Sequence, residues 1–265
     1  MPIIETGGLV CRYGSFTAVD SLSLSVEPGE LFGLLGPNGA GKSTVIKTLT
    51  TLLRPTRGTA AVAGFDVVRQ AASVRRSIGY VPQLVSADQS LTGYENLWVF
   101  ARLYDVPRRE REQRIEYSLA FMGLEEVAGR LVRTYSGGMI RRLEIAQSIL
   151  HHPRVLFLDE PTIGLDPLAR KAVWDHIREL RDKFGMTILM TTHLMDEADS
   201  LCGRVAIMHH GKMVALGSPA ELKAAIGGNG STLEDVFVHY TGDQLAEGGT
   251  YRDVSRTRRN AKRLG

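Results

Sequence analysis

The segment from Gly36 to Ser43 constrains the fold of this chain more than any other. Its sequence, Gly-Pro-Asn-Gly-Ala-Gly-Lys-Ser, follows a short apolar run, Leu31 to Leu35, and precedes a helical pattern from Ser43 to Leu53. A glycine-rich turn between a buried strand and a helix presents backbone N–H groups and a helix N-terminus to phosphate oxygens. We therefore expect a strand–loop–helix unit that binds the phosphates of ATP.

Two side chains at the end of this loop carry the expected chemistry. Lys42 is predicted to bring a positive charge to the β- and γ-phosphates, and Ser43 to offer its hydroxyl to Mg²⁺. A helix N-terminus stabilises an exposed anion by only about 0.3–1 kcal/mol, so several loop amides must contact the phosphates as well. The predicted ATP-binding residues of this segment are Gly36, Pro37, Asn38, Gly39, Ala40, Gly41, Lys42, Ser43 and, at the α-phosphate, Thr44.

A second apolar run, Val155 to Leu158, ends in two adjacent carboxylates, Asp159 and Glu160. If this strand lies beside the strand that leads into the phosphate loop, Asp159 holds Mg²⁺. Because side chains alternate along an extended chain, Glu160 is expected to point elsewhere and to polarise an attacking water molecule. Taken alone, the two carboxylates are equally compatible with the start of a solvent-exposed loop.

Ser136, Gly137 and Gly138 open a further helical pattern, expected from Met139 to Leu150. Ser136 is a suitable N-cap, and the two glycines leave backbone amides accessible at the positive end of the helix. One phosphate loop is enough for one triphosphate. A second anion-binding helix end therefore indicates contact with nucleotide held by another copy, although taken alone it is equally compatible with a flexible helix start.

Strand and helix patterns alternate along most of the chain, which predicts an α/β sheet. A long helical stretch between residues 91 and 152, with Leu91 to Glu95 as its capped start, interrupts this alternation. After a glycine-rich break at residues 227–230, Ser231 and Glu234 have the spacing of a capping box, so a short helix should follow. The predicted strands are Leu22–Val26, Leu31–Leu35, Thr59–Val62, Ile78–Val81, Val155–Leu158, Thr187–Thr191 and Val205–Met208.

The composition is that of an ordinary globular protein, with 43% hydrophobic and 23% charged residues. No apolar run approaches the ~20 residues that span a bilayer, and residues 1–10 do not resemble a secretory signal. Two cysteines, Cys11 and Cys202, give no disulfide framework and fit a reducing compartment. We expect a cytoplasmic protein.

The net charge of +3 is unevenly distributed. Residues 251–265 contain six Arg or Lys residues against the single acid Asp253. Such a tail is typical of a solvated chain end, and the alternative is attraction to anionic lipid head groups or to an acidic partner. No nucleic-acid partner is expected.

The ordered motifs resemble those of the ATP-binding subunits of ABC transporters. Walker A (Gly36–Ser43), the signature (Ser136–Gly138) and Walker B (Asp159–Glu160) follow one another in the family's order. The resemblance implies an α/β fold, namely a P-loop NTPase (RecA-like) core with an N-terminal antiparallel β subdomain and an inserted α-helical subdomain. The implied bounds are 1–228 for the ATPase domain, about 1–90 and 153–228 for core and β subdomain, about 91–152 for the helical subdomain, and 229–265 for a C-terminal extension.

The same resemblance assigns roles to four more residues. Tyr13 matches the aromatic residue that stacks on adenine, and Gln83 the glutamine that contacts Mg²⁺ or the lytic water and couples to the permease. Asp166 matches the loop that crosses to the other protomer, and His193 the histidine that contacts the γ-phosphate. The resulting catalytic set is Glu160, His193, Gln83 and Lys42, and the metal set is Ser43, Gln83 and Asp159.

Two segments indicate which subfamily of ABC transporter ATPases the chain resembles. Tyr135–Ala146 and Leu233–Phe237 are similar to daunorubicin-resistance-type exporter ATPases. Such proteins pair with separately encoded membrane permeases and export drugs, lipids or polysaccharides, which implies a permease, a second copy and a place on the inner face of the membrane. Met139 stands where the usual signature has Gln and cannot donate an amide hydrogen bond, but Ser136 and the backbone amides remain.

Two other classes of protein are alternatives to an ABC transporter subunit. A soluble ABC-type ATPase acting on ribosomes usually has two motif sets in one chain, and one acting on DNA has a long coiled coil before the signature. This chain has one motif set and no heptad run in residues 44–135. A P-loop kinase or GTPase leaves Ser136–Gly138 unexplained, and no Asn-Lys-x-Asp segment is present.

Overall fold

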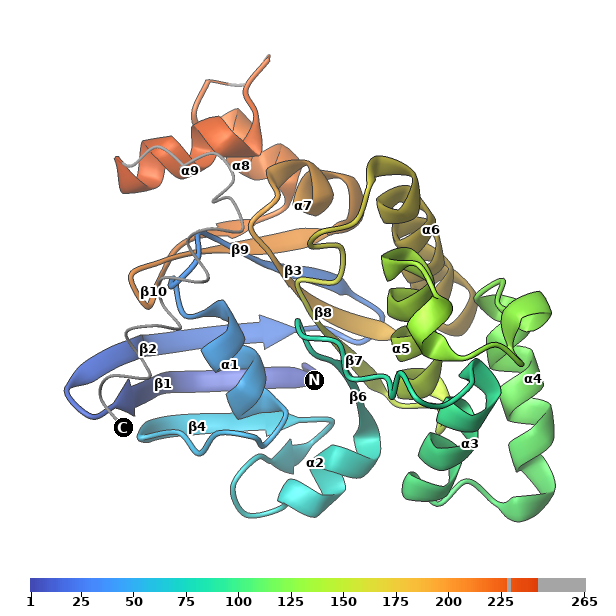
Figure 1. Ribbon diagram of the computed structural model, residues 1–265. Helices are drawn as coiled ribbons and strands as arrows, with labels where there is room; N and C mark the ends of the chain where they lie inside the picture. The colour runs from blue at the N-terminus through green and yellow to red at the C-terminus, as the bar shows by residue number, and fades with distance from the viewer. Residues whose placement is uncertain (228–229, 243–265) are drawn as a thin grey trace, which may run out of the picture.

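The computed structural model describes residues 1–227 and 230–242, and a six-stranded sheet lies at its centre (Figure 1). The strand order is β10-β9-β3-β8-β7-β6, all parallel except β10, which pairs antiparallel with β9 at the edge. The basic tail at residues 251–265 lies outside the described residues. The strands are β3 (Leu31–Leu35), β6 (Ile78–Val81), β7 (Val155–Asp159), β8 (Thr187–Thr192), β9 (Arg204–His209) and β10 (Lys212–Gly217).

The central strands are apolar along their whole length because both faces of the sheet are covered. Every residue of β7 is buried. Leu156 and Leu158 pack on one side with the helices, and Val155 and Phe157 pack on the other side with the second sheet. A parallel strand covered on both faces reads as a continuous hydrophobic run, which is why this strand is recognisable from the sequence.

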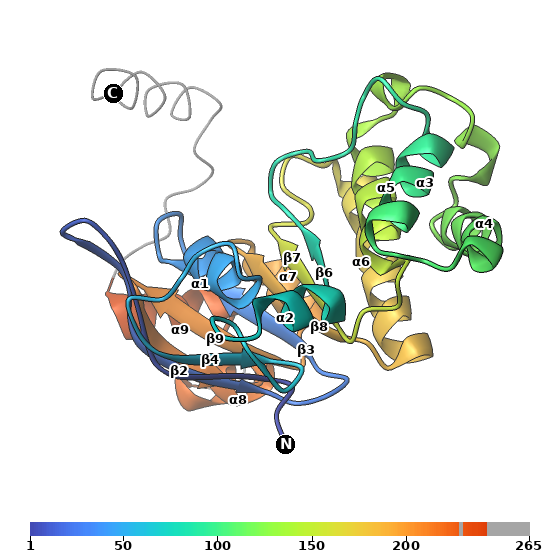
Figure 2. The same cartoon turned by 90° about the horizontal axis from the view of Figure 1, so that it is seen from below.

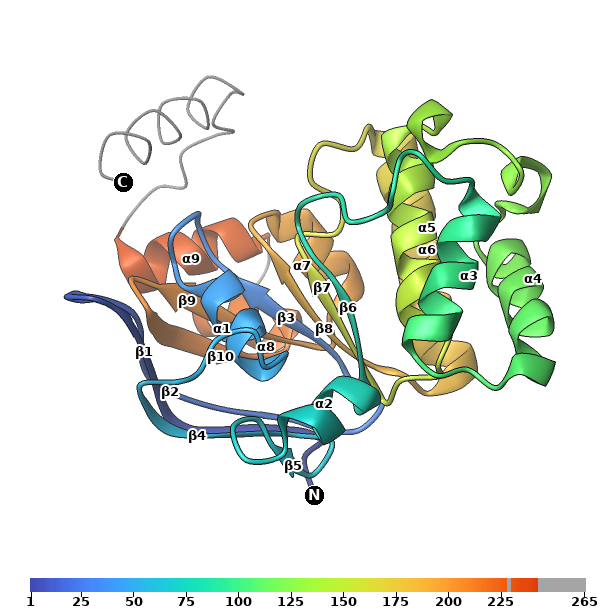
Figure 3. The same cartoon turned by 60° about the horizontal axis from the view of Figure 1, so that its bottom comes forward.

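The second sheet is antiparallel and has the order β2-β1-β4-β5. Its strands are β1 (Ile4–Tyr13), β2 (Phe16–Val26), β4 (Arg57–Val62) and β5 (Phe65–Asp66). Helix α1 (Lys42–Leu49) lies against this sheet and shares one apolar core with it and with β3 (Figure 3). The antiparallel sheet and the parallel sheet confirm the predicted fold class.

Helix α1 is shorter than the sequence suggested. It ends at Leu49 rather than Leu53, because Thr51 adopts a left-handed backbone with φ of +66°. The amides of both Leu52 and Leu53 then bond to the carbonyl of Lys47, which turns the chain out of the helix. The β-branched Thr50 and Thr51 favour this early end.

Three helices gather in a lobe beside the sheets (Figure 2). They are α3 (Gly93–Leu103), α4 (Arg111–Phe121) and α5 (Gly137–Ile149), and α6 (Pro167–Phe184) packs against them. Thr92 forms the expected capping box with Glu95 at the start of α3. The division into subdomains near residues 91 and 152 remains a prediction. Across the described ranges 1–227 and 230–242, no helix has the length and hydropathy needed to cross a bilayer.

The remaining α-helices of the described chain are α2 (Ala71–Ser77), α7 (Met195–Leu201), α8 (Pro219–Ala225) and α9 (Leu233–Thr241), and three 3₁₀ turns lie at Arg108–Glu110, Glu125–Val127 and Val132–Thr134. The predicted cap of α9 is wrong by one residue. The capping box is formed by Thr232 and Asp235, not by Ser231 and Glu234. Both pairs have the right spacing, but Thr232 has the extended backbone of an N-cap and its side chain accepts from the Asp235 amide, so the helix begins at Leu233.

The cap of α9 gives a direct test. Thr232→Ala removes the acceptor for the Asp235 amide and is expected to lower the free energy of unfolding by about 1 kcal/mol. Ser231→Ala, its neighbour and matched control, should stay within about 0.5 kcal/mol of the parent. Urea denaturation of both variants measures the difference. A larger loss in Ser231→Ala would contradict the cap seen here.

Candidate functional site

The phosphate loop joins β3 to α1 at the carboxyl edge of the parallel sheet. Gly36 and Gly41 have φ values of +153° and +103°, which side-chain-bearing residues rarely adopt. A Cβ atom at Gly36 would clash with the carbonyl oxygen of Met208, and one at Gly41 with the carbonyl oxygen of Ala18. Glycine is therefore required at both positions by conformation and by space.

Lys42 lies at the centre of this loop, with only 4% of its surface exposed. Its Nζ donates to the carbonyl of Gly36 at 2.6 Å and of Pro37 at 3.1 Å, and lies 3.3 Å from Oε1 of Glu160. Burial lowers the pKa of Lys42, while the carboxylate of Glu160 acts in the opposite direction. The ammonium group is thus desolvated and oriented by the loop.

Asp159 contacts the first residue after Lys42 across the sheet. Ser43 Oγ donates to Asp159 Oδ1 at 3.1 Å, and Thr191 Oγ1 donates to the same oxygen at 2.6 Å. The expectation that the Asp159 strand is the neighbour of the loop strand is wrong, because β8 lies between β3 and β7. The contact is made instead by the first turn of α1, where Ser43 bonds to Asp159 at the end of β7.

Glu160 does not continue the strand. Its φ is +49°, in the left-handed region, and its amide bonds to Thr191 at both the carbonyl and the hydroxyl. The predicted alternation of an extended chain therefore does not apply, since the backbone itself turns at this residue. The turn brings the carboxylate toward the phosphate loop rather than away from it.

The carboxylate of Glu160 is the meeting point of the site. Besides Lys42, its Oε2 lies 3.0 Å from Nδ1 of His193, and Gln83 Nε2 donates to it at 3.5 Å. Burial raises the pKa of Glu160, but the hydrogen bonds and charges of His193 and Lys42 outweigh burial and leave the pKa below its ordinary value. Four chain segments thus place one ionised carboxylate among two nitrogen donors and a lysine.

The other predicted residues lie apart from this cluster. Tyr13 ends β1 and is 48% exposed. Ser136 caps α5 through its hydroxyl, which accepts from the amide of Met139 at 3.3 Å. Asp166 caps α6, accepting from two backbone amides of its first turn. Gly138 has a packing role as well, because a Cβ there would press on Ala169 of α6.

Sequence reasoning missed Thr191, which fixes both Asp159 and Glu160 from the neighbouring strand β8. It also missed Arg141 and Glu144, which are buried on α5. The available signal for the latter was a pair of opposite charges at i and i+3 on the same helix. Thr191 gave no signal beyond its place at the end of an apolar strand.

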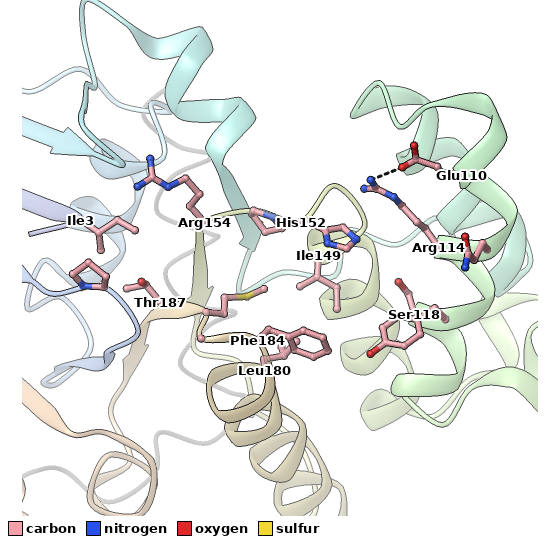
Figure 4. Close-up of a pocket in the computed structure, with 16 residues that line it drawn as sticks. Ile3, Glu110, Arg114, Ser118, Ile149, His152, Arg154, Leu180, Phe184 and Thr187 are labelled. Carbon is pink, nitrogen blue, oxygen red and sulfur yellow. Dashed lines mark hydrogen bonds and ion pairs between the residues drawn. The ribbon is translucent and has the colours of Figure 1, made fainter.

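A cavity of about 820 Å³ lies elsewhere in the molecule (Figure 4). It is bordered by Arg114 and Tyr117 of α4, by Phe184 at the end of α6, and by Thr187 at the start of β8. Thr187 begins the strand whose other end leads to His193, so the cavity opens at the amino edge of the sheet. It does not join the phosphate loop.

The fold and the loop define a P-loop ATPase. A family model described as ABC transporter matches residues 19–163, more than half of the chain. Among solved structures, one described as the ATP-binding subunit of an ABC transporter superimposes with a TM-score of 0.80 at 30% identity, covering 90% of this chain and 99% of that one. Another, cbiO1 from Clostridium perfringens, gives 0.78 at 28% identity, covering 84% and 91%.

Relatives found by sequence support the same family assignment. A daunorubicin/doxorubicin resistance ATP-binding protein, DrrA, of Streptomyces peucetius is 50% identical over 226 residues, which are 85% of this chain and 68% of the relative. The Nod factor export ATP-binding protein I of Ralstonia nicotianae is 44% identical over 83% of this chain and 68% of its own length. This chain belongs to the ABC transporter family, as an ATP-binding domain that hydrolyses ATP.

Substitutions at Gly39 and Gly41 distinguish the effect of backbone strain from that of a steric clash. Gly41→Ala combines a strained backbone with a clash against Ala18, whereas a methyl group at Gly39 (φ +85°) meets only open space. A strained backbone costs about 1–3 kcal/mol, so Gly39→Ala should weaken ATP binding by about 5- to 150-fold. Gly41→Ala should weaken it further. Titration calorimetry with ATP measures both, and equal affinities for the two variants would contradict the loop geometry.

Proposed function

We propose that this chain is the ATP-hydrolysing subunit of an exporter that moves a drug, lipid or polysaccharide through a separate membrane permease. The observation that carries the proposal is the carboxylate of Glu160, held by Lys42, His193 and Gln83 at the end of β7. An ionised, oriented carboxylate beside a phosphate loop is suited to take a proton from attacking water. Positioning and electrostatics supply the remainder of phosphoryl transfer.

The residues around Glu160 have distinct proposed roles. His193 orients the carboxylate and contacts the γ-phosphate, and Lys42 neutralises charge that develops on the phosphates. Gln83 reaches from the end of β6 and positions the water. His193 and Lys42 keep the pKa of Glu160 below its ordinary value, so the carboxylate is ionised at neutral pH, the protonation state that a base requires.

Ser43 and Asp159 fit a magnesium ion. They present a hydroxyl and a carboxylate oxygen 3.1 Å apart, and Mg²⁺ is commonly bound by one or two carboxylates together with substrate phosphates. Gln83 completes the proposed metal set. Bound by these residues, magnesium would neutralise negative charge on the phosphates of ATP.

We further propose that two copies enclose two ATP molecules. Each nucleotide would lie between one phosphate loop and the Ser136–Gly138 helix end of the other copy. The hydroxyl of Ser136 accepts from the amide of Met139 and keeps its own proton, so this hydroxyl and the amides of Gly137 and Gly138 would donate to a phosphate. Tyr13 would stack on the adenine, and Asp166 would lie at the contact between copies.

The relatives support export as the process. Their descriptions name daunorubicin and doxorubicin resistance and Nod factor export, not ribosome or DNA metabolism. We accordingly propose that the chain acts in the cytoplasm, on the inner face of the membrane, bound to an integral permease. The cargo itself would be recognised by that permease.

Glu160→Gln tests the mechanism. Loss of the general base should lower turnover by about 10²–10⁴-fold while ATP affinity is kept, and the stalled protein should accumulate as a dimer. Sedimentation with saturating ATP and a steady-state ATPase assay read out both effects. Glu125→Gln, an exposed carboxylate in the helical lobe, is the matched control and should behave as the parent. A monomeric Glu160→Gln protein under these conditions would contradict the sandwich.

Affinity purification from solubilised membranes tests the partner. The tagged chain is expected to bring down a protein with several membrane spans, and ATPase activity of the pair should exceed that of the chain alone. Sedimentation of the tagged chain with ribosomes, together with no membrane protein in the eluate, would contradict the transporter assignment.

A further inference from the structure

Helix α5 buries a charged pair against the segment that carries Gln83. Arg141 and Glu144 are only 5% and 2% exposed. Arg141 donates to the carbonyl of Pro82 at 2.7 Å from Nη1 and to the carbonyl of Gln83 at 3.1 Å from Nη2. The guanidinium group thus holds the two peptide groups on either side of Gln83.

Glu144 holds the other end of the same segment. Its Oε1 accepts from the amide and from the hydroxyl of Ser86, the latter at 2.9 Å. Its Oε2 lies 3.0 Å from Arg141 Nη1 but, within the described part of the chain, accepts no hydrogen bond. The N–H groups of Arg141 point at the backbone carbonyls instead, so the charge of Glu144 balances an arginine that is committed to the Gln83 loop.

One turn further along α5, Gln147 extends the contact. Its Nε2 donates to Asn96 Oδ1 at 3.1 Å, and the same oxygen accepts from the amide of Asp88 at 2.9 Å. Positions 141, 144 and 147 repeat every third residue and form one face of the helix. The segment 82–88 is therefore fastened to α5 directly through Arg141 and Glu144, and indirectly through Asn96 of α3.

We propose that Arg141 and Glu144 are positioning residues for ATP hydrolysis, which act by holding the Gln83 loop where Gln83 meets Glu160. The inference rests on the proposed role of Gln83 and goes beyond it. Gln83 itself is exposed and its bond to Glu160 is long, at 3.5 Å, so its side chain alone does not fix its place. The hydrogen bonds from Arg141 to the backbone fix the position of Gln83.

Helix α5 also connects the two nucleotide sites of the proposed dimer. Helix α5 begins at Ser136, which would face the nucleotide of the other copy, and five residues later Arg141 grips the loop of its own site. A rigid helix transmits displacement along its length. Movement at the Ser136 end therefore changes where Gln83 lies relative to Glu160, which makes hydrolysis in one site depend on closure at the other.

The test removes the pair without leaving a buried unpaired charge. In Arg141→Met/Glu144→Leu both charges are replaced by apolar groups of similar size, a change that often leaves the stability of a buried ion pair intact. Turnover should fall by about 10- to 100-fold, as for misplacement of a catalytic group by about 1 Å, with the KM for ATP unchanged. The matched control is Glu110→Leu/Arg114→Met, an N-cap residue and a first-turn residue of α4, a pair whose arginine likewise donates to a backbone carbonyl. It should hydrolyse ATP as the parent does.

A cycle with Gln83 identifies the route. If the pair acts through Gln83, then adding Arg141→Met/Glu144→Leu to Gln83→Ala should change turnover by no more than about twofold. If the losses of turnover in Gln83→Ala and in the pair variant multiply when the two are combined, the inference is overturned. Parental turnover in the pair variant would also overturn it. Full activity in Gln83→Ala, with a loss in the pair variant, would also overturn it. By contrast, parental turnover in Glu160→Gln would refute the proposed function itself.

A milder variant covers the case in which the pair variant does not fold. Ser86→Ala deletes one hydrogen bond to Glu144 from an exposed residue, so the core is left unchanged. Turnover should fall by about 2- to 10-fold, the effect of one hydrogen bond. The loss should disappear when Gln83→Ala is already present. Parental turnover in Ser86→Ala, or a loss that persists with Gln83→Ala, would overturn the inference.

Discussion

The contact between Lys42 and Glu160 joins the phosphate loop to the end of β7, and the geometry of the site depends on it. Two opposite charges lie 3.3 Å apart with no more than 5% of either residue exposed. Removing such charges from water costs several kcal/mol each, which their attraction offsets only where hydrogen bonds satisfy the remaining polar atoms. Two loop carbonyls do this for Lys42, and His193 and Gln83 do it for Glu160.

The same contact links occupancy of the loop to the state of the carboxylate. An ammonium group has three donors, and within the part of the chain that the structure describes Lys42 has three partners, namely the carbonyls of Gly36 and Pro37 and the carboxylate of Glu160. A phosphate that approaches Lys42 must replace at least one of them. If it replaces Glu160, the carboxylate loses one of the interactions that lower its pKa and becomes a stronger base as substrate arrives.

Local patterns predicted the elements well, and long-range geometry explains the misses. The phosphate loop, β7 and the cap at Ser136 follow from rules that involve a few neighbouring residues. The insertion of β8 between β3 and β7 depends on the order of parallel strands, which no single segment encodes. The turn at Glu160 is imposed by Thr191 from another strand. The anchoring of Gln83 by Arg141 joins residues 58 apart in the chain, so neither segment announces it.

The left-handed backbone of Glu160 sets stability against the proposed chemistry at one residue. Holding a residue with a side chain at φ of +49° costs about 1–2 kcal/mol, and glycine would avoid that cost. A substitution to glycine would also remove a carboxylate that is buried beside Lys42. The same substitution would remove the proposed base, so a variant stabilised at this position is not expected to be an active one.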